Sequence, residues 1–167
     1  MPNNSAQSRS VITTPRLSVR YLNESDYSAF SLLESDPDVR RFVGGPSSVS
    51  LADYQRLIST PSKTCMAVCR KSDGRFIGRC GFRDSTDRIE LEILLLPDEQ
   101  GQGFGRELFE AMISYSRAAF PGLKVAATVS PMNSRAINLL TANGFTDSGE
   151  TVTLKSGSQQ SVYLRIS

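Results

Sequence analysis

A glycine-rich loop between a predicted strand and a predicted helix constrains the fold of this chain more than any other stretch. The strand 88-RIELEILLL-96 ends at Pro97, and 98-DEQGQGFGRELFEAM-112 follows with glycine at every second position of its loop. Such a loop leaves backbone amides free at the start of the next helix, and free amides attract an anion. The spacing of the glycines indicates which anion this is.

The spacing excludes two common nucleotide-binding motifs. A dinucleotide site needs Gly-x-Gly-x-x-Gly, whereas here the third glycine is followed directly by Arg106, and no Gly-Lys-Ser/Thr of a phosphate loop follows. The remaining pattern is Gln-x-x-Gly-x-Gly, carried by Gln100, Gly103 and Gly105. It suits a pyrophosphate at a helix N-terminus, where a glycine lets the phosphate approach the backbone. Taken alone, the loop also fits a plain helix cap, so both interpretations stay open.

The other elements predict a mixed α/β fold. The expected strands are 16–22, 64–70, 75–83, 88–96, 123–129, 145–154 and 161–166. The expected helices are 23–34 with Asn23 as its cap, 37–42, 50–59, 103–119 and 133–143 with Gly144 at its end. This order predicts a central, mostly antiparallel sheet with one parallel crossover, flanked by helices. We expect residues 1–10 to be a flexible N-terminus and residues 11–167 to form a single domain.

The composition excludes several functional classes. The 167 residues suffice for one domain with a core, and 39% of them are hydrophobic. A net charge of +2 gives no reason to propose a nucleic-acid partner, and no apolar run has the length of a membrane span. The polar start MPNNSAQSRS lacks the apolar stretch of a signal peptide, so we expect a cytoplasmic protein.

Three cysteines and the absence of histidine limit the chemistry further. Cys65, Cys69 and Cys80 are odd in number and lie in apolar, strand-like surroundings, which indicates core thiols in a reducing compartment. A nucleophilic thiol lacks a partner base, because the chain contains no histidine. The same absence removes His-based triads and most zinc sites, so no metal site is expected.

Three stretches in the same order and spacing as in a known family carry a resemblance. They are 14-TPRLSVRYLNESDYSAFSLLESDPDVRRFVGGP-46, 90-ELEILLLPDEQGQGFGREL-108 and 133-NSRAINLLTANGF-145. Together they resemble the GNAT superfamily of acetyl-coenzyme A-dependent N-acetyltransferases. Within that superfamily they are most similar to the ribosomal-protein (Rim-type) N-terminal acetyltransferases. The resemblance implies a GNAT-like acyl-CoA N-acyltransferase fold and acetyl-CoA as co-substrate.

The resemblance assigns the residues that bind the coenzyme. Its pyrophosphate would be bound by the loop amides of Gln100, Gly101, Gln102, Gly103, Phe104, Gly105 and Arg106. The pantetheine arm would lie along the backbone of Leu94, Leu95 and Leu96, which are otherwise core residues, and relatives usually bulge this strand to form an oxyanion donor. Asn133 would meet the same arm and is equally well explained as a helix N-cap.

Two glutamates of the strand before the loop are the candidate bases. The subgroup often has a glutamate seven residues before the proline, which is Glu90 here, and Glu92 shares its face of the strand. The resemblance assigns proton removal to Glu90 in preference to Glu92, and the open alternative is a solvated, charged strand face. Many relatives place a tyrosine acid where this chain has Leu140. This questions a dedicated acid but not the activity, since a thiol of pKa about 8.5 leaves as thiolate without full protonation.

The implied activity is transfer of an acetyl group from acetyl-CoA to a primary amine, by direct attack of the neutral amine in a ternary complex. The preferred acceptor is the α-amine of a protein or peptide N-terminus, because a pKa of about 8 leaves roughly a tenth of it neutral at pH 7. Two alternatives stay open. One is a small-molecule amine such as an amino acid, a polyamine or an aminoglycoside, and the other is a module that binds acyl-CoA without catalysis. A monomer or a homodimer is expected.

Overall fold

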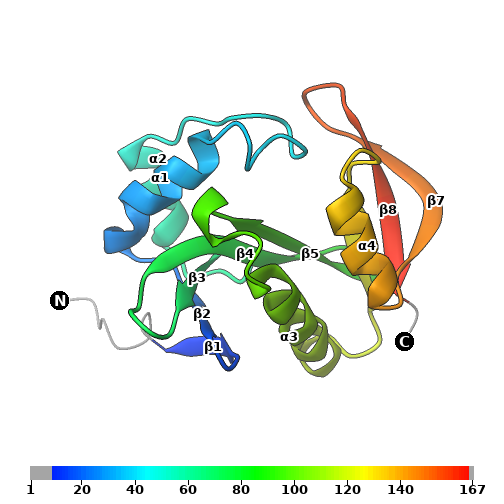
Figure 1. The fold of residues 1–167 in the computed structure, drawn as a ribbon, viewed down its shortest axis with the longest axis horizontal. Coiled ribbons are helices and arrows are strands. Elements are labelled where there is room, and N and C mark those ends of the chain that lie inside the picture. Colours follow the sequence, from blue (N-terminus) through cyan, green and yellow to red (C-terminus); the bar gives the residue numbers. More distant parts are fainter. Residues whose placement is uncertain (1–8, 166–167) are drawn as a thin grey trace.

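The strands of residues 9–165, the part of the chain that the structure describes, form one sheet in the order β1-β2-β3-β4-β5-β6-β8-β7 (Figure 1). This computed structural model has strands β1 (Ser10–Thr13), β2 (Leu17–Tyr21), β3 (Met66–Arg70), β4 (Phe76–Asp84), β5 (Arg88–Leu95), β6 (Lys124–Val129), β7 (Thr146–Thr153) and β8 (Gln159–Arg165). Neighbouring strands are antiparallel except β5 and β6, which are parallel. The predicted mixed α/β fold with one parallel crossover is confirmed.

Three of the described helical segments begin at a polar side chain that caps them, namely Asn23, Ser50 and Asn133, whereas the N-cap of the longest helix is Gly103. Their bounds are α1 (Tyr27–Ser35), α2 (Leu51–Ile58), α3 (Phe104–Ala119) and α4 (Ser134–Ala142), with short 3-10 turns η1 (Glu24–Asp26) and η2 (Pro97–Glu99). Asn23 forms a capping box with Asp26, so the predicted cap is confirmed, although a 3-10 turn precedes the α-helix. Within residues 9–165, no helix is both long and apolar enough to cross a membrane.

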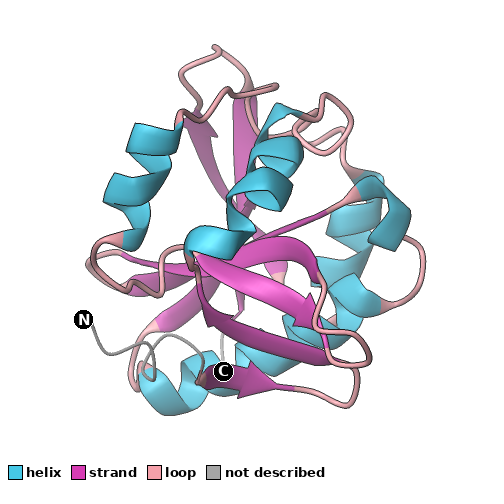
Figure 2. Ribbon diagram, turned by 90° about the vertical axis from the view of Figure 1, so that its left-hand side faces the viewer, coloured by secondary structure: helices cyan, strands magenta, loops and turns pink. Residues whose placement is uncertain are grey.

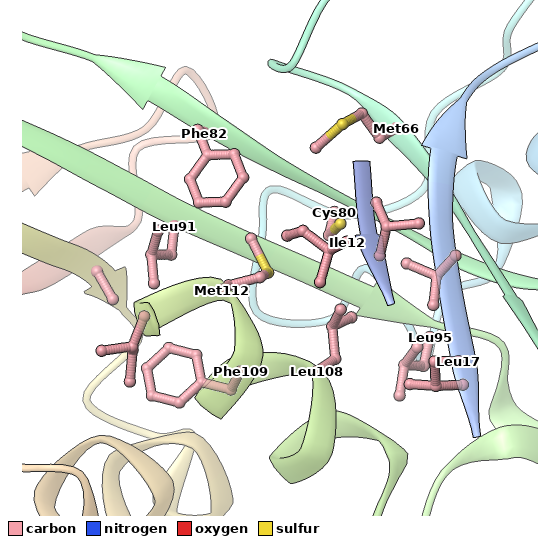
Figure 3. Close-up of a cluster of buried hydrophobic side chains, with 14 of the residues drawn as sticks. Ile12, Leu17, Met66, Cys80, Phe82, Leu91, Leu95, Leu108, Phe109 and Met112 are labelled. Carbon is pink, nitrogen blue, oxygen red and sulfur yellow. The ribbon is translucent and has the colours of Figure 1, made fainter. Parts of the chain in front are cut away.

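Helices cover both sides of the sheet (Figure 2). The core between α3 and the sheet contains Leu108 and Met112, which are fully buried, packed with side chains of several strands (Figure 3). A second core lies between α1, α2 and the opposite face, where Phe30, Leu33 and Tyr54 are buried. Each large apolar side chain buried in this way contributes roughly 1.5–3 kcal/mol. The two cores fix both helical layers on one central sheet.

Two segments differ from the prediction. Residues 37–44 form turns instead of a helix, because the side chain of Asp36 accepts hydrogen bonds from the amides of Asp38 and Val39 at 2.8 and 2.9 Å. The edge strand β1 was not predicted. Residues 1–8 of the predicted flexible N-terminus, and residue 166 of the last predicted strand, lie outside the described residues. Ser10, placed in that N-terminus by the prediction, begins β1.

Candidate functional site

The two parallel strands at the centre of the sheet separate after a short stretch of pairing. β5 pairs with β6 only over Arg88–Glu90 and Lys124–Ala126. β4 stays paired with β5 as far as Leu95, and β8 with β6 as far as Val129, so each diverging strand keeps its outer neighbour. The gap holds a cleft of about 730 Å³, which is within the size range of small-molecule sites.

The cleft passes through the sheet from one helical layer to the other. Its α3 side, where α3 and α4 pack, is lined by Phe109 and Leu140 among others. Its α1 side is lined by Phe42, which follows α1, by Glu92 of β5 and by Gln160 of β8. Successive side chains of a strand point to opposite faces, so the same two strands supply walls to both sides. Phe42 and Gln160 were not predicted, because no local pattern relates positions so far apart.

The loop between β5 and α3 forms the rim of the cleft on the α3 side. Gly101 and Gly103 have φ angles of +77° and +82°, a left-handed conformation that glycine adopts without strain. A Cβ atom at Gly101 would meet no atom within 4 Å, and one at Gly103 would lie 3.3 Å from Arg16. The loop therefore presents bare backbone to the cleft, as the glycine spacing predicts.

The amides of residues 101–106 have no hydrogen-bond acceptor within the described chain. They surround the N-terminus of α3, a helix of 16 residues whose dipole adds partial positive charge at this end. Free amides, left-handed glycines and the helix dipole together suit a pyrophosphate group. The backbone of this loop thus fits the coenzyme that the sequence suggests.

Two arginines from outside the motif hold the loop in place. Arg70 of β3 pairs with the buried Glu99 of η2 at 2.8 Å, just before the loop. Arg16, between β1 and β2, donates to the carbonyl oxygen of Gln102 at 3.0 Å and pairs with Glu107 of α3 at 2.7 Å. Both contacts join segments that are distant in the sequence, so the motif alone did not predict them.

The prediction of a bulge in β5 is wrong for the stretch in which β5 pairs with β4. The register runs without a shift from Gly78 opposite Leu95 to Asp84 opposite Ile89. A bulge inserts an extra residue into one strand and offsets all pairs beyond it, and no such offset occurs along this ladder. The cleft here arises from the divergence of β6 and not from a bulge against β4.

The backbone of β5 also narrows the set of residues that can hold a ligand. The amide of Leu96 donates to the carbonyl oxygen of Ile77 at 2.8 Å, toward β4 and away from the cleft. Backbone groups of successive residues alternate in direction, so Leu94 faces the same way as Leu96. Of the three leucines predicted, only Leu95 therefore turns its backbone toward the cleft. Its carbonyl oxygen accepts a hydrogen bond from Nε2 of Gln100 at 3.0 Å. The amide of Leu95 is therefore the backbone group of this residue that is left to bind a ligand.

Asn133 and Leu140 both line the cleft. Oδ1 of Asn133 accepts a hydrogen bond from the amide of Ala136 at 3.1 Å, so its predicted role as N-cap of α4 is confirmed. Leu140 is buried and offers no proton. The hydroxyl groups that line the cleft in the described chain belong to Thr128, Ser130 and Ser134. None occupies the helix position at which relatives place an acid.

The structure separates the two candidate glutamates. Glu92 lines the cleft and pairs with Arg79 of β4 at 3.3 Å. Glu90 is half-buried and lies where β5 is still paired with β6, opposite Ala126, and it does not belong to the lining of the cleft. The geometry therefore favours Glu92, in contrast to the preference for Glu90 drawn from the resemblance.

A buried arginine connects Glu92 to α1. Arg79 lies at the centre of β4 and also pairs with Glu34 of α1. Burial by itself lowers the pKa of Arg79, but the charges of Glu92 and Glu34 outweigh it and leave the pKa raised. Burial also raises the pKa of the nearby Cys65 thiol to about 11, which makes it a poor nucleophile. The sequence signal for this network was an arginine inside the apolar strand 75-RFIGRCGFR-83.

Comparison with known proteins agrees with this geometry. Residues 16–146 match the family described as "Acetyltransferase (GNAT) domain". The uncharacterized N-acetyltransferase p20 of Bacillus licheniformis is 23% identical over 146 residues, which cover 81% of this chain and 82% of that protein. The fold is similar to a GNAT-family acetyltransferase from Bacillus anthracis, with a TM-score of 0.79, 16% identity, and coverage of 93% of this chain and 97% of that chain.

A second solved structure is spermidine N-acetyltransferase from Vibrio cholerae in complex with CoA and spermine. Its TM-score is 0.74 at 22% identity, and the match covers 89% of this chain and 92% of that chain. At this identity the two structures show a shared fold and nothing about a shared acceptor. The family match covers most of the chain, so the chain belongs to the GNAT acetyltransferase family and is an acetyl-CoA-dependent acetyltransferase.

Proposed function

We propose that this enzyme acetylates the α-amine of a protein or peptide N-terminus. The observation that carries the proposal is the charge of the cleft. Within residues 9–165, its charged lining consists of Asp38, Glu92, Arg106 and Arg135, and Arg79 balances Glu92 from the neighbouring strand. A polyamine or an aminoglycoside carries several positive charges and is bound best where several carboxylates face it. A peptide N-terminus carries a single positive charge.

The apolar character of the α1 side supports the same acceptor class. Val39, Phe42, Val43 and Leu94 line this side of the cleft. Such walls suit the side chain of a small neutral N-terminal residue, while the following peptide adds no further charge. The resemblance of residues 14–46 to the Rim-type N-terminal acetyltransferases supports this choice, because α1 and the loop after it lie in that stretch.

The chemistry at Leu140 favours an amine of low pKa. A leucine gives no proton to the departing thiolate, so the site offers less acid–base help than one with a tyrosine. An α-amine with a pKa of about 8 is roughly a tenth neutral at pH 7, whereas a lysine at about 10.4 is almost fully charged. The difference of about 2.5 pKa units corresponds to roughly 3.4 kcal/mol. An α-amine therefore requires less from the protein.

We assign acetyl-CoA to the α3 side of the cleft. The amides of residues 101–106 are the groups suited to its pyrophosphate, and the backbone of Leu95 and Ile93 is suited to its pantetheine arm. Asn133 lies on the same cleft and is assigned to that arm. When bound, the coenzyme supplies an acetyl group activated as a thioester. The protein's part is to orient that group toward the α1 side and to exclude bulk water.

We assign proton removal from the acceptor to Glu92, through a water molecule, in place of Glu90. Glu92 is the carboxylate of β5 that lines the cleft, and its position is fixed by Arg79 of β4, which is in turn paired with Glu34 of α1. A fixed carboxylate beside the acceptor amine also orients the ammonium group before it loses its proton. We further propose that the enzyme acts in the reducing cytoplasm, because Cys65, Cys69 and Cys80 are free thiols.

A panel of acceptors tests the proposal. The panel contains a short peptide with a free N-terminal alanine, the same peptide with a blocked N-terminus and one lysine, spermidine, and an aminoglycoside. We expect the free N-terminus to give the highest kcat/KM, and fragment mass spectrometry to locate the acetyl group on the α-nitrogen. Acetylation of only the lysine or the small molecules would contradict the acceptor class and leave the family assignment intact. Acetyl-CoA binding without turnover on any acceptor would favour the non-catalytic alternative.

A further inference from the structure

The loop that follows α1 reaches across the cleft to β8. Figure 1 shows the segment after α1 extending toward the β7–β8 hairpin. Nε2 of Gln160 donates a hydrogen bond to the carbonyl oxygen of Phe42 at 3.0 Å, and the two residues are 118 positions apart. Both line the cleft, so residues 37–45 and β8 together bound its α1 side.

Gln160 is placed unusually for its hairpin. Nearly every residue of β7 and the first residue of β8, Gln159, are exposed, but Gln160 is only 4% exposed. A buried amide needs a hydrogen-bond partner, and the partner here is the carbonyl oxygen of Phe42. This buried side chain reaches across the cleft and binds a backbone group of the loop. It therefore fixes the position of the loop whatever the loop's side chains are.

The other end of the same loop is fixed separately. Nε and Nη2 of Arg40 donate to the carbonyl oxygens of Gly45 and Val43 at 2.7 and 3.1 Å. Nη1 of Arg40 pairs with Glu34 of α1 at 2.6 Å. These contacts tie the loop to α1 as far as Val43, the residue after Phe42, and Gln160 adds a contact from β8 at Phe42 itself.

We propose that Gln160 is a specificity-determining residue. By holding Phe42 against β8, it narrows the α1 side of the cleft so that an amine with a small group on its α-carbon enters and an amine with a bulkier group there is rejected. The inference rests on the proposed function, because it requires the acceptor to enter on this side. A bulky acceptor has to displace Phe42 and break the hydrogen bond, and the loss of one such bond corresponds to a discrimination of about three- to tenfold.

The test uses matched variants of neighbouring glutamines. Gln160→Met keeps an unbranched side chain of similar length but removes the donor, and Gln160→Ala removes the side chain. Gln159→Met is the control, because Gln159 is the same residue type on the same strand and is exposed. Two quantities are measured in each variant. The first is hydrogen exchange of the backbone amides in residues 37–45. The second is the ratio of kcat/KM for a peptide that begins with isoleucine to that for the same peptide with alanine.

We expect Gln160→Met to speed exchange in residues 37–45 and to raise the isoleucine-to-alanine ratio about three- to tenfold. The affinity for acetyl-CoA should not change, and Gln159→Met should match the wild type in every measurement. Unchanged exchange in both Gln160 variants would overturn the role of the hydrogen bond. Faster exchange with an unchanged ratio would overturn the role in specificity.

The failure of the proposed function gives a different result. If the wild type acetylates small amines but no peptide, the acceptor class is wrong, and the ratio is measured instead with isopropylamine and n-propylamine. A rise in that ratio in Gln160→Met would support the inference, and an unchanged ratio would overturn it. If no amine of either kind is acetylated, both proposals are wrong.

Discussion

Arg16 and Glu107 are 91 positions apart in the sequence and form a two-point contact beside the glycine loop. The backbone amide of Arg16 donates to Oε1 of Glu107 at 2.9 Å, and its Nε donates to Oε2 at 2.7 Å. The guanidinium group also lies 4.4 Å from the ring centre of Phe104, the first residue of α3. One side chain thus holds the start of α3 and, through the carbonyl oxygen of Gln102, the loop before it.

This contact predicts a loss of coenzyme affinity when Arg16 is replaced. Arg16→Ala removes a charge-assisted hydrogen bond to the loop and its support of α3, so the Kd for acetyl-CoA should rise about three- to tenfold. The kcat at saturating acetyl-CoA should stay close to the wild type, because Arg16 does not line the cleft. Isothermal titration and steady-state kinetics measure the two quantities. Arg117→Ala, at the other end of α3, is the control, and equal affinities of the two variants would contradict the role of Arg16.

The same pair predicts a pH dependence of stability. Burial raises the pKa of Glu107, but hydrogen bonds from Thr14 and from Arg16 lower it by more than burial raises it. The pKa of Glu107 therefore lies below the ordinary value. A lowered carboxyl pKa stabilises the fold above the unfolded pKa of about 4.3, and this stabilisation is lost as the pH falls through the folded pKa. Glu107→Gln should therefore unfold at a lower Tm than the wild type at pH 7. The difference should shrink below about pH 4. A difference in Tm that stays constant from pH 7 to pH 3 would argue against an ionised Glu107.

Gly103 gives a direct test of the coenzyme loop. Its φ of +82° disfavours any side chain, and a Cβ there would lie 3.3 Å from Arg16, so Gly103→Val should distort the loop and obstruct its amides. We expect the affinity for acetyl-CoA to fall more than tenfold while the fold is retained. Gly122→Val is the matched control, because Gly122 has a φ of +85° in the turn after α3, away from the cleft. If both variants lose affinity equally, backbone strain and not the coenzyme loop is responsible.

The elements that the sequence predicted correctly carry a local signal, either burial on one face or a turn between two apolar runs. In α3, Phe104, Leu108 and Met112 recur at helical spacing, and all three are buried. The hairpin of β3 and β4 was marked by the turn 71-KSDG-74 between two apolar runs, and the strands pair as expected. Burial on one face repeats with the period of the element itself, so a local pattern is sufficient to find it.

The segments that it missed depend on competing local hydrogen bonds or on pairing at an edge. Residues 37–42 have a proline at a favourable position for a helix, but Asp36 caps their amides and Arg40 holds the following carbonyl groups. The edge strand β1 is four residues long and has a register shift between Ser10 and Ile12. Neither feature produces a period that a sequence can show.

The site was predicted in part, for a related physical reason. The glycine loop follows from local backbone chemistry, and its geometry has the predicted form. The choice between Glu90 and Glu92 depends on where β5 and β6 separate, which is set by packing over the whole sheet. The hydrogen bond from the Leu96 amide to the carbonyl oxygen of Ile77 likewise depends on the register between β5 and β4. A short motif determines neither of these.

The two glutamates provide the sharpest test of the acid–base assignment. Glu92 lines the cleft, so Glu92→Gln should lower kcat by about tenfold or more and remove the acidic limb of the pH–rate profile. Glu90→Gln should resemble the wild type, because Glu90 lies where β5 is still paired with β6. Glutamine at position 92 leaves Arg79 its buried partner Glu34, so the fold should persist and the affinity for acetyl-CoA should change little.

Steady-state kinetics across pH, with the Tm of each variant as a check on folding, separate the possible results. Loss of activity only in Glu90→Gln would restore the assignment that the resemblance favoured and contradict the one based on the cleft. Wild-type rates in both variants would mean that the amine reaches the site already neutral. In that case the rate should follow the ionisation of the acceptor itself, and peptides whose α-amines differ in pKa should give pH–rate profiles displaced by the same amount.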